Sequence, residues 1–146
     1  MPLDIVRGPA GAGKSQYVRD HMRRGDVVLD VTRLWAALGG FERGPDGKYP
    51  EREDDGVLNL ARIVRAQAIA AAVRHALSGF VTTSTSGEQH IEETFRRRGV
   101  SGAVVTLDPG IEVVRGRLAD ENGNLTRACE SALERWYQCA VPRTWR

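Results

Sequence analysis

Lysine and cysteine are both scarce in this chain of 146 residues. Of its 21 basic residues only Lys14 and Lys48 are lysines, so arginine carries almost all of the positive charge. The two cysteines, Cys129 and Cys139, lie ten positions apart in a stretch with helical spacing. That spacing excludes a zinc knuckle and CxxC redox chemistry, and we expect both thiols to be ordinary packing residues.

A long apolar run and a strong excess of one charge are also missing. No apolar run approaches the roughly 20 residues that cross a bilayer, and Met1 leads directly into a short strand rather than a signal peptide. We therefore expect a cytoplasmic protein without a membrane partner. The net charge of +2 gives no general electrostatic case for nucleic acid. The length favours a single domain over residues 1–146.

Strand-like and helix-like segments alternate along the chain. Apolar runs predict strands at 3–6, 26–31, 79–83 and 103–108. Helical spacing predicts helices at 14–24, 34–38, 57–77, 88–98, 111–118 and 125–140. Continuous apolar strands that alternate with helices are typical of a parallel sheet covered on both faces. The sequence therefore predicts an α/β three-layer sandwich with a short parallel sheet.

Three further features concern the middle and the end of the chain. Residues 40–56 are polar and rich in glycine and proline, which is typical of a functional or mobile loop. In the closing helix, Leu133 and Trp136 are expected to point inward. The long helix that follows the loop has an apolar stripe that we expect to face the core: Val57, Leu60, Ala61, Val64, Ala68 and Ala71.

Residues 8–15, GPAGAGKS, match the pattern G-x-x-x-x-G-K-[ST], with a predicted strand before them and a predicted helix after them. The glycines Gly8, Gly11 and Gly13 allow the backbone to turn tightly and to approach phosphate oxygens. The amides of residues 11–15 then point into one concavity at the positive end of the helix. This arrangement is typical of a phosphate-binding loop.

The lysine within this loop explains an apparent exception in an arginine-rich chain. Lys14 is a slim point charge that can reach the β- and γ-phosphates, where the planar fork of arginine fits poorly. The Ser15 hydroxyl is the expected ligand of Mg²⁺. We therefore predict a P-loop protein that binds ATP and Mg²⁺. The expected nucleotide-binding residues are Gly8, Pro9, Ala10, Gly11, Ala12, Gly13, Lys14, Ser15 and Gln16.

The rest of the chain narrows the class of P-loop protein. It has no N-K-x-D motif of the GTPases, and Asp108 is followed by Pro109 rather than by the glutamate of ring-forming ATPases. In order, GPAGAGKS, VVLDVTRLWAAL, GFVTTST and VVTLDPGIEVVRGRLADENG resemble the P-loop nucleoside, nucleotide and polynucleotide kinases. The resemblance is greatest to the phage type of polynucleotide kinase-like domain, a kinase-like ATP-binding protein of the AAA group.

The resemblance implies an acceptor hydroxyl held beside the second strand. Asp30, at the carboxyl end of that strand, is the candidate general base and metal ligand, and the alternative roles are a helix N-cap or a ligand of a Mg²⁺-bound water. The acidic residue that acts as the general base in this family aligns with Thr32 of this chain. The arginine that often lies near that base aligns with Arg33 or has no counterpart, because Trp35 stands at the position that matches most simply. The family's acid after the third strand is replaced by Thr83, Ser84, Thr85 and Ser86.

The segment LDPGIEVVRGRL resembles the element that leads into a kinase lid, with 120–124 as a short lid-like turn. Arg115, Arg117 and Arg127 are the candidates that would close over the transferring phosphate. Arg115 and Arg117 are two positions apart and cannot share a helical face, so we expect at most one of them to reach the phosphates. A solvated helix surface is the alternative for each arginine.

The expected function is transfer of the γ-phosphate of ATP to a hydroxyl or phosphate of a nucleoside, a nucleotide or a polynucleotide 5′ end. Arg62 and Arg65 share a face of the long helix and could contact a phosphate-bearing acceptor, although exposed helix charges are the default. The alternative function is an ATPase or a nucleotide-dependent switch that acts through a protein or nucleic-acid partner. The sequence favours no oligomeric state.

Overall fold

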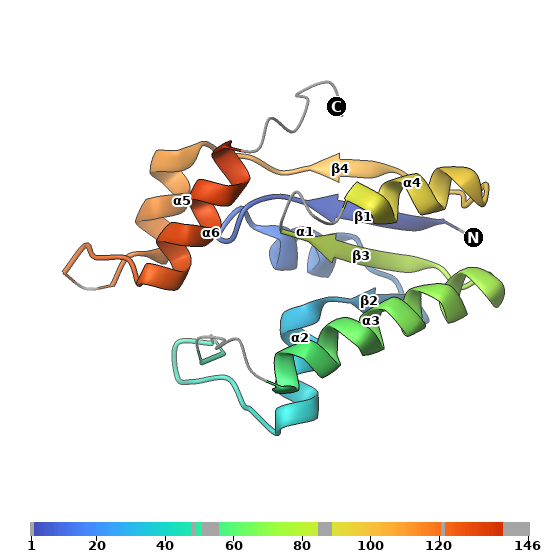
Figure 1. Cartoon of the computed structure of the whole chain (residues 1–146), viewed down its shortest axis with the longest axis horizontal. Helices are drawn as coiled ribbons and strands as arrows, with labels where there is room; N and C mark the ends of the chain where they lie inside the picture. The colour runs from blue at the N-terminus through green and yellow to red at the C-terminus, as the bar shows by residue number, and fades with distance from the viewer. Residues whose placement is uncertain (1, 48, 51–55, 85–88, 121, 139–146) are drawn as a thin grey trace.

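A computed structural model describes residues 2–47, 49–50, 56–84, 89–120 and 122–138. Its four strands form one parallel sheet in the order β2–β3–β1–β4 (Figure 1). The strands are β1 (Leu3–Arg7), β2 (Val27–Leu29), β3 (Gly79–Thr83) and β4 (Val104–Thr106). Ile5 of β1 is paired with Val81 of β3 on one side and with Val104 of β4 on the other.

Helices cover both faces of this sheet, which confirms the predicted α/β three-layer fold (Figure 1). The helices are α1 (Lys14–His21), α2 (Val31–Gly39), α3 (Gly56–Arg74), α4 (Gln89–Arg97), α5 (Ile111–Leu118) and α6 (Arg127–Gln138). Helices α3 and α4 lie on one face, and α1 lies on the other. Helices α5 and α6 lie together at the carboxyl end of the strands.

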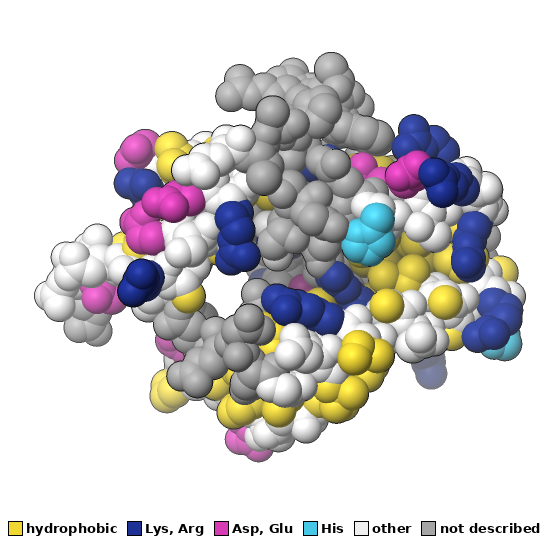
Figure 2. Space-filling view, viewed as in Figure 1, with side chains coloured by type: hydrophobic (Ala, Val, Ile, Leu, Met, Phe, Trp, Pro, Cys, Tyr) yellow, Lys and Arg dark blue, Asp and Glu magenta, His cyan; other side chains and the backbone are white. Residues whose placement is uncertain are grey.

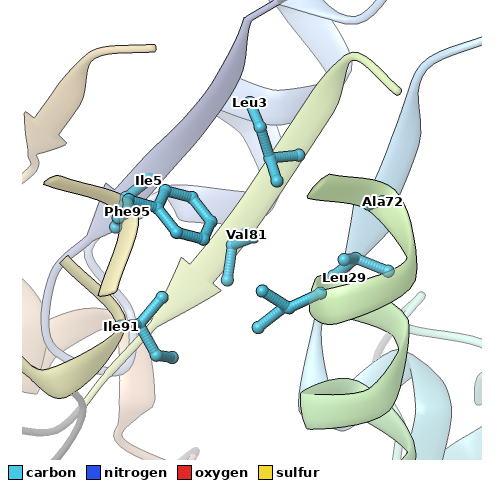
Figure 3. Packing of buried hydrophobic residues seen from close by; sticks show 8 residues of the cluster. Leu3, Ile5, Leu29, Ala72, Val81, Ile91 and Phe95 are labelled. Carbon is cyan, nitrogen blue, oxygen red and sulfur yellow. The ribbon is translucent and has the colours of Figure 1, made fainter. Parts of the chain in front are cut away.

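The two sides of β1 show why its sequence is apolar throughout. Leu3 and Ile5 face α3 and α4, in a cluster that includes Val81 and Phe95 (Figure 3). Val6 points to the opposite face, where it packs with residues of α1 and β3. A strand that is buried on both faces needs apolar side chains at odd and even positions alike.

Several element boundaries differ from the prediction. Helix α1 ends at His21 rather than at 24, because Met22 is already extended while its N–H closes the last turn on Val18. Strand β2 is shorter than predicted because Asp30 caps α2 and Val31 already belongs to that helix. The predicted start of one helix at residue 88 and the predicted end of another at residues 139–140 lie outside the described residues.

The predicted apolar stripe of α3 is confirmed only in part: Ala61 is buried and Val57 and Ala68 pack against core clusters, but the centre of the stripe is rotated from the buried face. Leu60 is 47% exposed, and the residues that face inward are Leu58, Ala61, Arg65, Ile69 and Ala72. The helix is rich in alanine and apolar on most of its circumference, so periodicity alone does not single out one face. The inward direction of Leu133 and Trp136 in α6 is confirmed, since both are buried.

Helix α3 has no long uninterrupted apolar run, since Asn59, Arg62 and Arg65 lie within it, but its average composition is apolar. Over its 19 residues it is long and apolar enough, by length and composition alone, to cross a bilayer. In this structure its residues Ile69 and Ala72 pack into the main core beside the sheet. Only 28% of its apolar stretch is buried inside the molecule, and its large apolar residues Leu60 and Ile63 are exposed.

Candidate functional site

The phosphate loop joins β1, which lies between β3 and β4, to the start of α1. Gly11 and Gly13 have φ of 77° and 95°, in the left-handed region that favours glycine. A Cβ on Gly8 would come within 2.4 Å of the carbonyl oxygen of Leu107, so only glycine lets the loop pass β4. Gly13 caps α1 without a side chain, which leaves the first amides of the helix for an anion.

The ammonium group of Lys14 folds back over this loop. Its Nζ donates to the carbonyl oxygens of Gly8, at 2.6 Å, and of Pro9, at 2.8 Å. Ser15 is exposed in the first turn of α1. The side-chain Nε2 of Gln16 donates to Oδ1 of Asp20, one turn further along the helix, at 2.7 Å. The glycine cradle, the ammonium and an accessible hydroxyl are the groups that a nucleotide triphosphate with Mg²⁺ requires.

Helix α5 brings one of the three candidate arginines to the loop. Nη1 of Arg117 donates to the carbonyl oxygen of Gly11 at 3.0 Å. Arg115 turns the other way and lies 3.7 Å from Glu130 of α6, while Arg127 is exposed at the start of that helix. The two residues of α5 therefore point to different faces, as their spacing predicts.

Asp30 lies at the carboxyl end of β2 with a donor on each carboxylate oxygen. Its Oδ1 accepts from the backbone N–H of Arg33 at 2.9 Å, as an N-cap does, and its Oδ2 accepts from the Thr82 hydroxyl at 2.5 Å. Arg65 of α3 is buried and donates from Nη1 to the carbonyl oxygen of Thr82 at 3.0 Å. These contacts connect α3, β3 and the candidate base at one edge of the sheet.

Other positions from the kinase resemblance lie elsewhere or are undescribed. Trp35 is buried in a core cluster and stacks on Phe41, with 4.2 Å between ring centroids, so it takes no part in this edge. Thr83 is buried at the end of β3. Thr85 and Ser86 lie outside the described residues. Figure 2 shows a gap in the surface between the α5–α6 part and the α2–α3 part, with Lys and Arg side chains beside it.

Residues 3–140 match a family model described as an AAA domain. The chain belongs to the AAA domain family. The match covers nearly the whole chain, from β1 through the phosphate loop to the end of α6. This AAA domain has the P-loop in the strand–loop–helix setting that the sequence predicts.

Two solved structures have similar folds, and one of the two is a kinase. An unliganded sugar kinase from Janibacter sp. HTCC2649 is 17% identical, with a TM-score of 0.52 over 92% of this chain and 77% of that chain. The tunicamycin resistance protein of Deinococcus radiodurans is 20% identical, with a TM-score of 0.54 and the same coverages. A search of curated proteins finds no match. The fold similarity agrees with an α/β P-loop domain built on a parallel four-stranded sheet.

One buried ion pair at this edge of the AAA domain was missed from the sequence. Arg7, directly before the phosphate loop, lies 3.3 Å from Glu92 of α4, and the side chains are 3% and 6% exposed. The Arg7 guanidinium also lies 5.5 Å from the ring centroid of Trp136 of α6. Side chains two positions apart lie on the same face of a strand, so Arg7 shares a face with the buried Leu3 and Ile5. This spacing predicts that the charge of Arg7 is buried, but it does not identify Glu92 as its partner.

A second contact holds α6 in the AAA domain beside the start of α5. The Tyr137 hydroxyl donates to Oδ1 of Asp108 at 2.8 Å, and the same oxygen accepts from the Gly110 amide at 3.1 Å. Burial raises the pKa of Tyr137 to about 12, and the hydrogen bond to Asp108 acts in the same direction. Helix α6 is thus anchored by adjacent aromatic residues at the carboxyl ends of both β1 and β4.

Proposed function

We propose that this AAA domain is a kinase that uses ATP and Mg²⁺ to phosphorylate a hydroxyl or phosphate group of a nucleoside, a nucleotide or a polynucleotide 5′ end. The observation that carries the proposal is the contact of Arg117 with Gly11 of the phosphate loop at 3.0 Å. An arginine that contacts the phosphate-binding loop from another helix is placed to stabilise charge during phosphoryl transfer. The resemblance of the sequence to nucleoside and polynucleotide kinases supports the acceptor class.

The residues of the loop have distinct roles in this proposal. The amides of residues 11–15 and the ammonium of Lys14 bind the phosphates, and Lys14 exchanges the carbonyl oxygens of Gly8 and Pro9 for phosphate oxygens. The Ser15 hydroxyl would hold Mg²⁺, which supplies positive charge against the phosphates. The guanidinium of Arg117 exchanges its hydrogen bond to the Gly11 carbonyl oxygen for contact with the transferring phosphoryl group.

In the transfer step, an oxygen of the acceptor bonds to the γ-phosphorus of ATP while the bond from that phosphorus to the β,γ-bridging oxygen breaks. ADP leaves, and the proton of an acceptor hydroxyl moves to Asp30. Because Oδ1 of Asp30 is held by the Arg33 amide, the proton goes to Oδ2, and the Thr82 hydroxyl must first turn away from it. Positioning and charge stabilisation supply most of the catalysis in such reactions.

The double hydrogen bonding of Asp30 also favours a second candidate function. A carboxylate whose two oxygens already accept from Arg33 and Thr82 serves well as a structural cap. If Asp30 has only that role, an acceptor hydroxyl loses its candidate base, which favours an ATPase or a nucleotide-dependent switch with a partner.

The fate of the γ-phosphate distinguishes the two functions. ATP labelled at this position is incubated with the protein, Mg²⁺ and a pool of nucleosides, nucleoside monophosphates and 5′-hydroxyl DNA and RNA. We expect label on an acceptor, loss of transfer in Lys14→Ala, and a fall of about 100-fold in Arg117→Ala. Arg115→Ala is the matched control, because Arg115 points to Glu130 instead of the loop. Label only in free phosphate would overturn the kinase proposal and support hydrolysis.

A further inference from the structure

An apolar groove lies between α3 and α4, apart from the phosphate loop. Its volume is about 220 Å³, and its apolar lining comes from Ile69, Ala70 and Val73 of α3 and from Ile91 and Phe95 of α4. Figure 2 shows hydrophobic side chains at the surface between these helices. Ile69, Ile91 and Phe95 are largely buried, so they form the floor of the groove.

An exposed apolar ridge on α3 continues the groove. Ile63 is 59% exposed, the largest exposed fraction among the large hydrophobic residues of the described chain, and Leu60 is 47% exposed. Ile63 continues the row of Ala66, Ala70 and Val73 at spacings of three, four and three, which keeps them on one side of the helix. Apolar surface that is contiguous over a groove and a ridge marks an interaction site.

No acidic residue is among the described residues that line the groove. Arg65, His90 and Arg98 are its titratable lining residues. Helix α3 contains three arginines and no acidic residue. On α4, Glu92 turns inward to Arg7 and Glu93 pairs with Arg97, so within the described residues no carboxylate lines the groove.

We propose that this groove docks an acidic amphipathic helix of a partner protein. The apolar residues of that helix would enter the hollow between α3 and α4 as a ridge enters a groove, and its carboxylates would face Arg98. A second copy docked through the same face would oppose Arg98 and Arg65 with their own like charges. A flat bilayer surface would cover the Ile63 ridge but would leave the hollow unfilled. The proposal is independent of the chemistry at the phosphate loop.

A displayed peptide library tests the proposal without a known partner. The peptides are about four helical turns long, with leucine at i, i+3 and i+7 spacing and with Glu, Lys, Gln or Ala at random elsewhere. We expect selection on the intact protein to enrich peptides rich in glutamate. No enrichment, or enrichment of lysine-rich peptides, would overturn the proposal.

Variants of the protein then locate the binding of a selected peptide, measured by fluorescence anisotropy. Ala70→Glu places a carboxylate in the groove and is expected to weaken binding by about tenfold or more. Ala128→Glu adds the same charge at an exposed position of α6, away from the groove and the ridge, and we expect unchanged affinity. Arg98→Gln is expected to weaken binding, whereas Arg97→Gln, one position away and outside the lining, is not.

Three outcomes of these measurements would overturn the proposal. The first is equal affinity of Ala70→Glu and wild type, and the second is equal loss in Ala70→Glu and Ala128→Glu. The third is binding to vesicles of phosphatidylserine and phosphatidylcholine that depends on Ala70 when no peptide does, which would assign the face to a membrane. Circular dichroism and ATP binding of each variant show whether the fold has remained intact.

Discussion

Asp30 is the residue whose two possible roles can be separated by one change of atom. Its Oδ1 caps α2, and its Oδ2 accepts from Thr82. Asparagine is as good an N-cap as aspartate, because its carbonyl oxygen still accepts from the Arg33 amide. Its NH₂ group can donate to the Thr82 hydroxyl, but it cannot take a proton from an acceptor.

We therefore predict that Asp30→Asn keeps its stability within about 0.5 kcal/mol of wild type and loses transfer by about 100-fold or more. Asp30→Ala removes the cap as well and is expected to cost a further ~1 kcal/mol. Urea unfolding measures the stability, and the labelled-phosphate assay measures the transfer. Full transfer activity in Asp30→Asn would restrict this residue to the structural role.

The raised pKa of Tyr137 predicts that the stability of the fold depends on pH in the alkaline range. This tyrosine has its pKa raised from the ordinary value of 10.0 to about 12 in the folded protein. Its stabilising effect is therefore fully present below pH 10 and is lost as the pH rises through 12, because only the unfolded state ionises between these values.

Tyr137→Phe removes both the hydrogen bond to Asp108 and this titration. We expect the variant to be less stable than wild type by about 1 kcal/mol at pH 8, with a difference that shrinks between pH 10 and pH 12. Urea unfolding at a series of pH values measures it. A constant difference over this range would show that the hydroxyl is not held by Asp108 in solution.

At the scale of elements, the Arg7–Glu92 pair joins β1 to α4 where both are buried. Loss of one partner leaves an uncompensated buried charge, so we predict that Glu92→Gln lowers the free energy of unfolding by about 3–5 kcal/mol. Replacement of both, as in Arg7→Met with Glu92→Leu, is expected to recover most of that loss. Both effects are measured by urea unfolding.

The exposed pair Arg97–Glu93 on the same helix is the matched control. Its side chains are 76% and 50% exposed, so Glu93→Gln is expected to change stability by less than about 1 kcal/mol. Equal effects of Glu92→Gln and Glu93→Gln would mean that the inner pair is hydrated rather than buried.

Most elements of the fold could be predicted because their signals are local. The residues GPAGAGKS determine a loop between a strand and a helix through glycine geometry and one lysine, and continuous apolar runs indicate strands buried on both faces. The centre of the stripe of α3 could not be predicted, because alanine is compatible with almost any face of a helix. The burial of Arg65 could not be predicted either, because its guanidinium donates to the carbonyl oxygen of Thr82, which lies on β3.

At the scale of the whole molecule, the contacts of the candidate site join distant positions in the sequence. Thr82 and Asp30 are 52 residues apart, and Arg117 and Gly11 are 106 residues apart. Such contacts depend on the order of strands in the sheet and on how each helix packs, and neither is determined by local pattern. The sequence could name Asp30 and Arg117 as candidates, but only the fold shows what each one contacts.

The position of the phosphate loop makes the whole fold sensitive to its ligand. The loop begins at the end of β1, which pairs with both β3 and β4, so a ligand that binds only the folded loop stabilises the entire sheet. At 100 times the dissociation constant the gain is about 2.7 kcal/mol, which corresponds to a rise in Tm on the order of 5–10 °C.

We therefore predict that ATP with Mg²⁺ raises the Tm of wild type by this amount, measured by differential scanning fluorimetry. AMP lacks the β- and γ-phosphates that Lys14 and the loop amides would hold, so it is expected to give a much smaller rise. Lys14→Ala is expected to lose most of the rise with ATP, whereas Ala70→Glu, in the groove on the other side of the sheet from α1, keeps it. An equal rise in Lys14→Ala would place the nucleotide away from the phosphate loop.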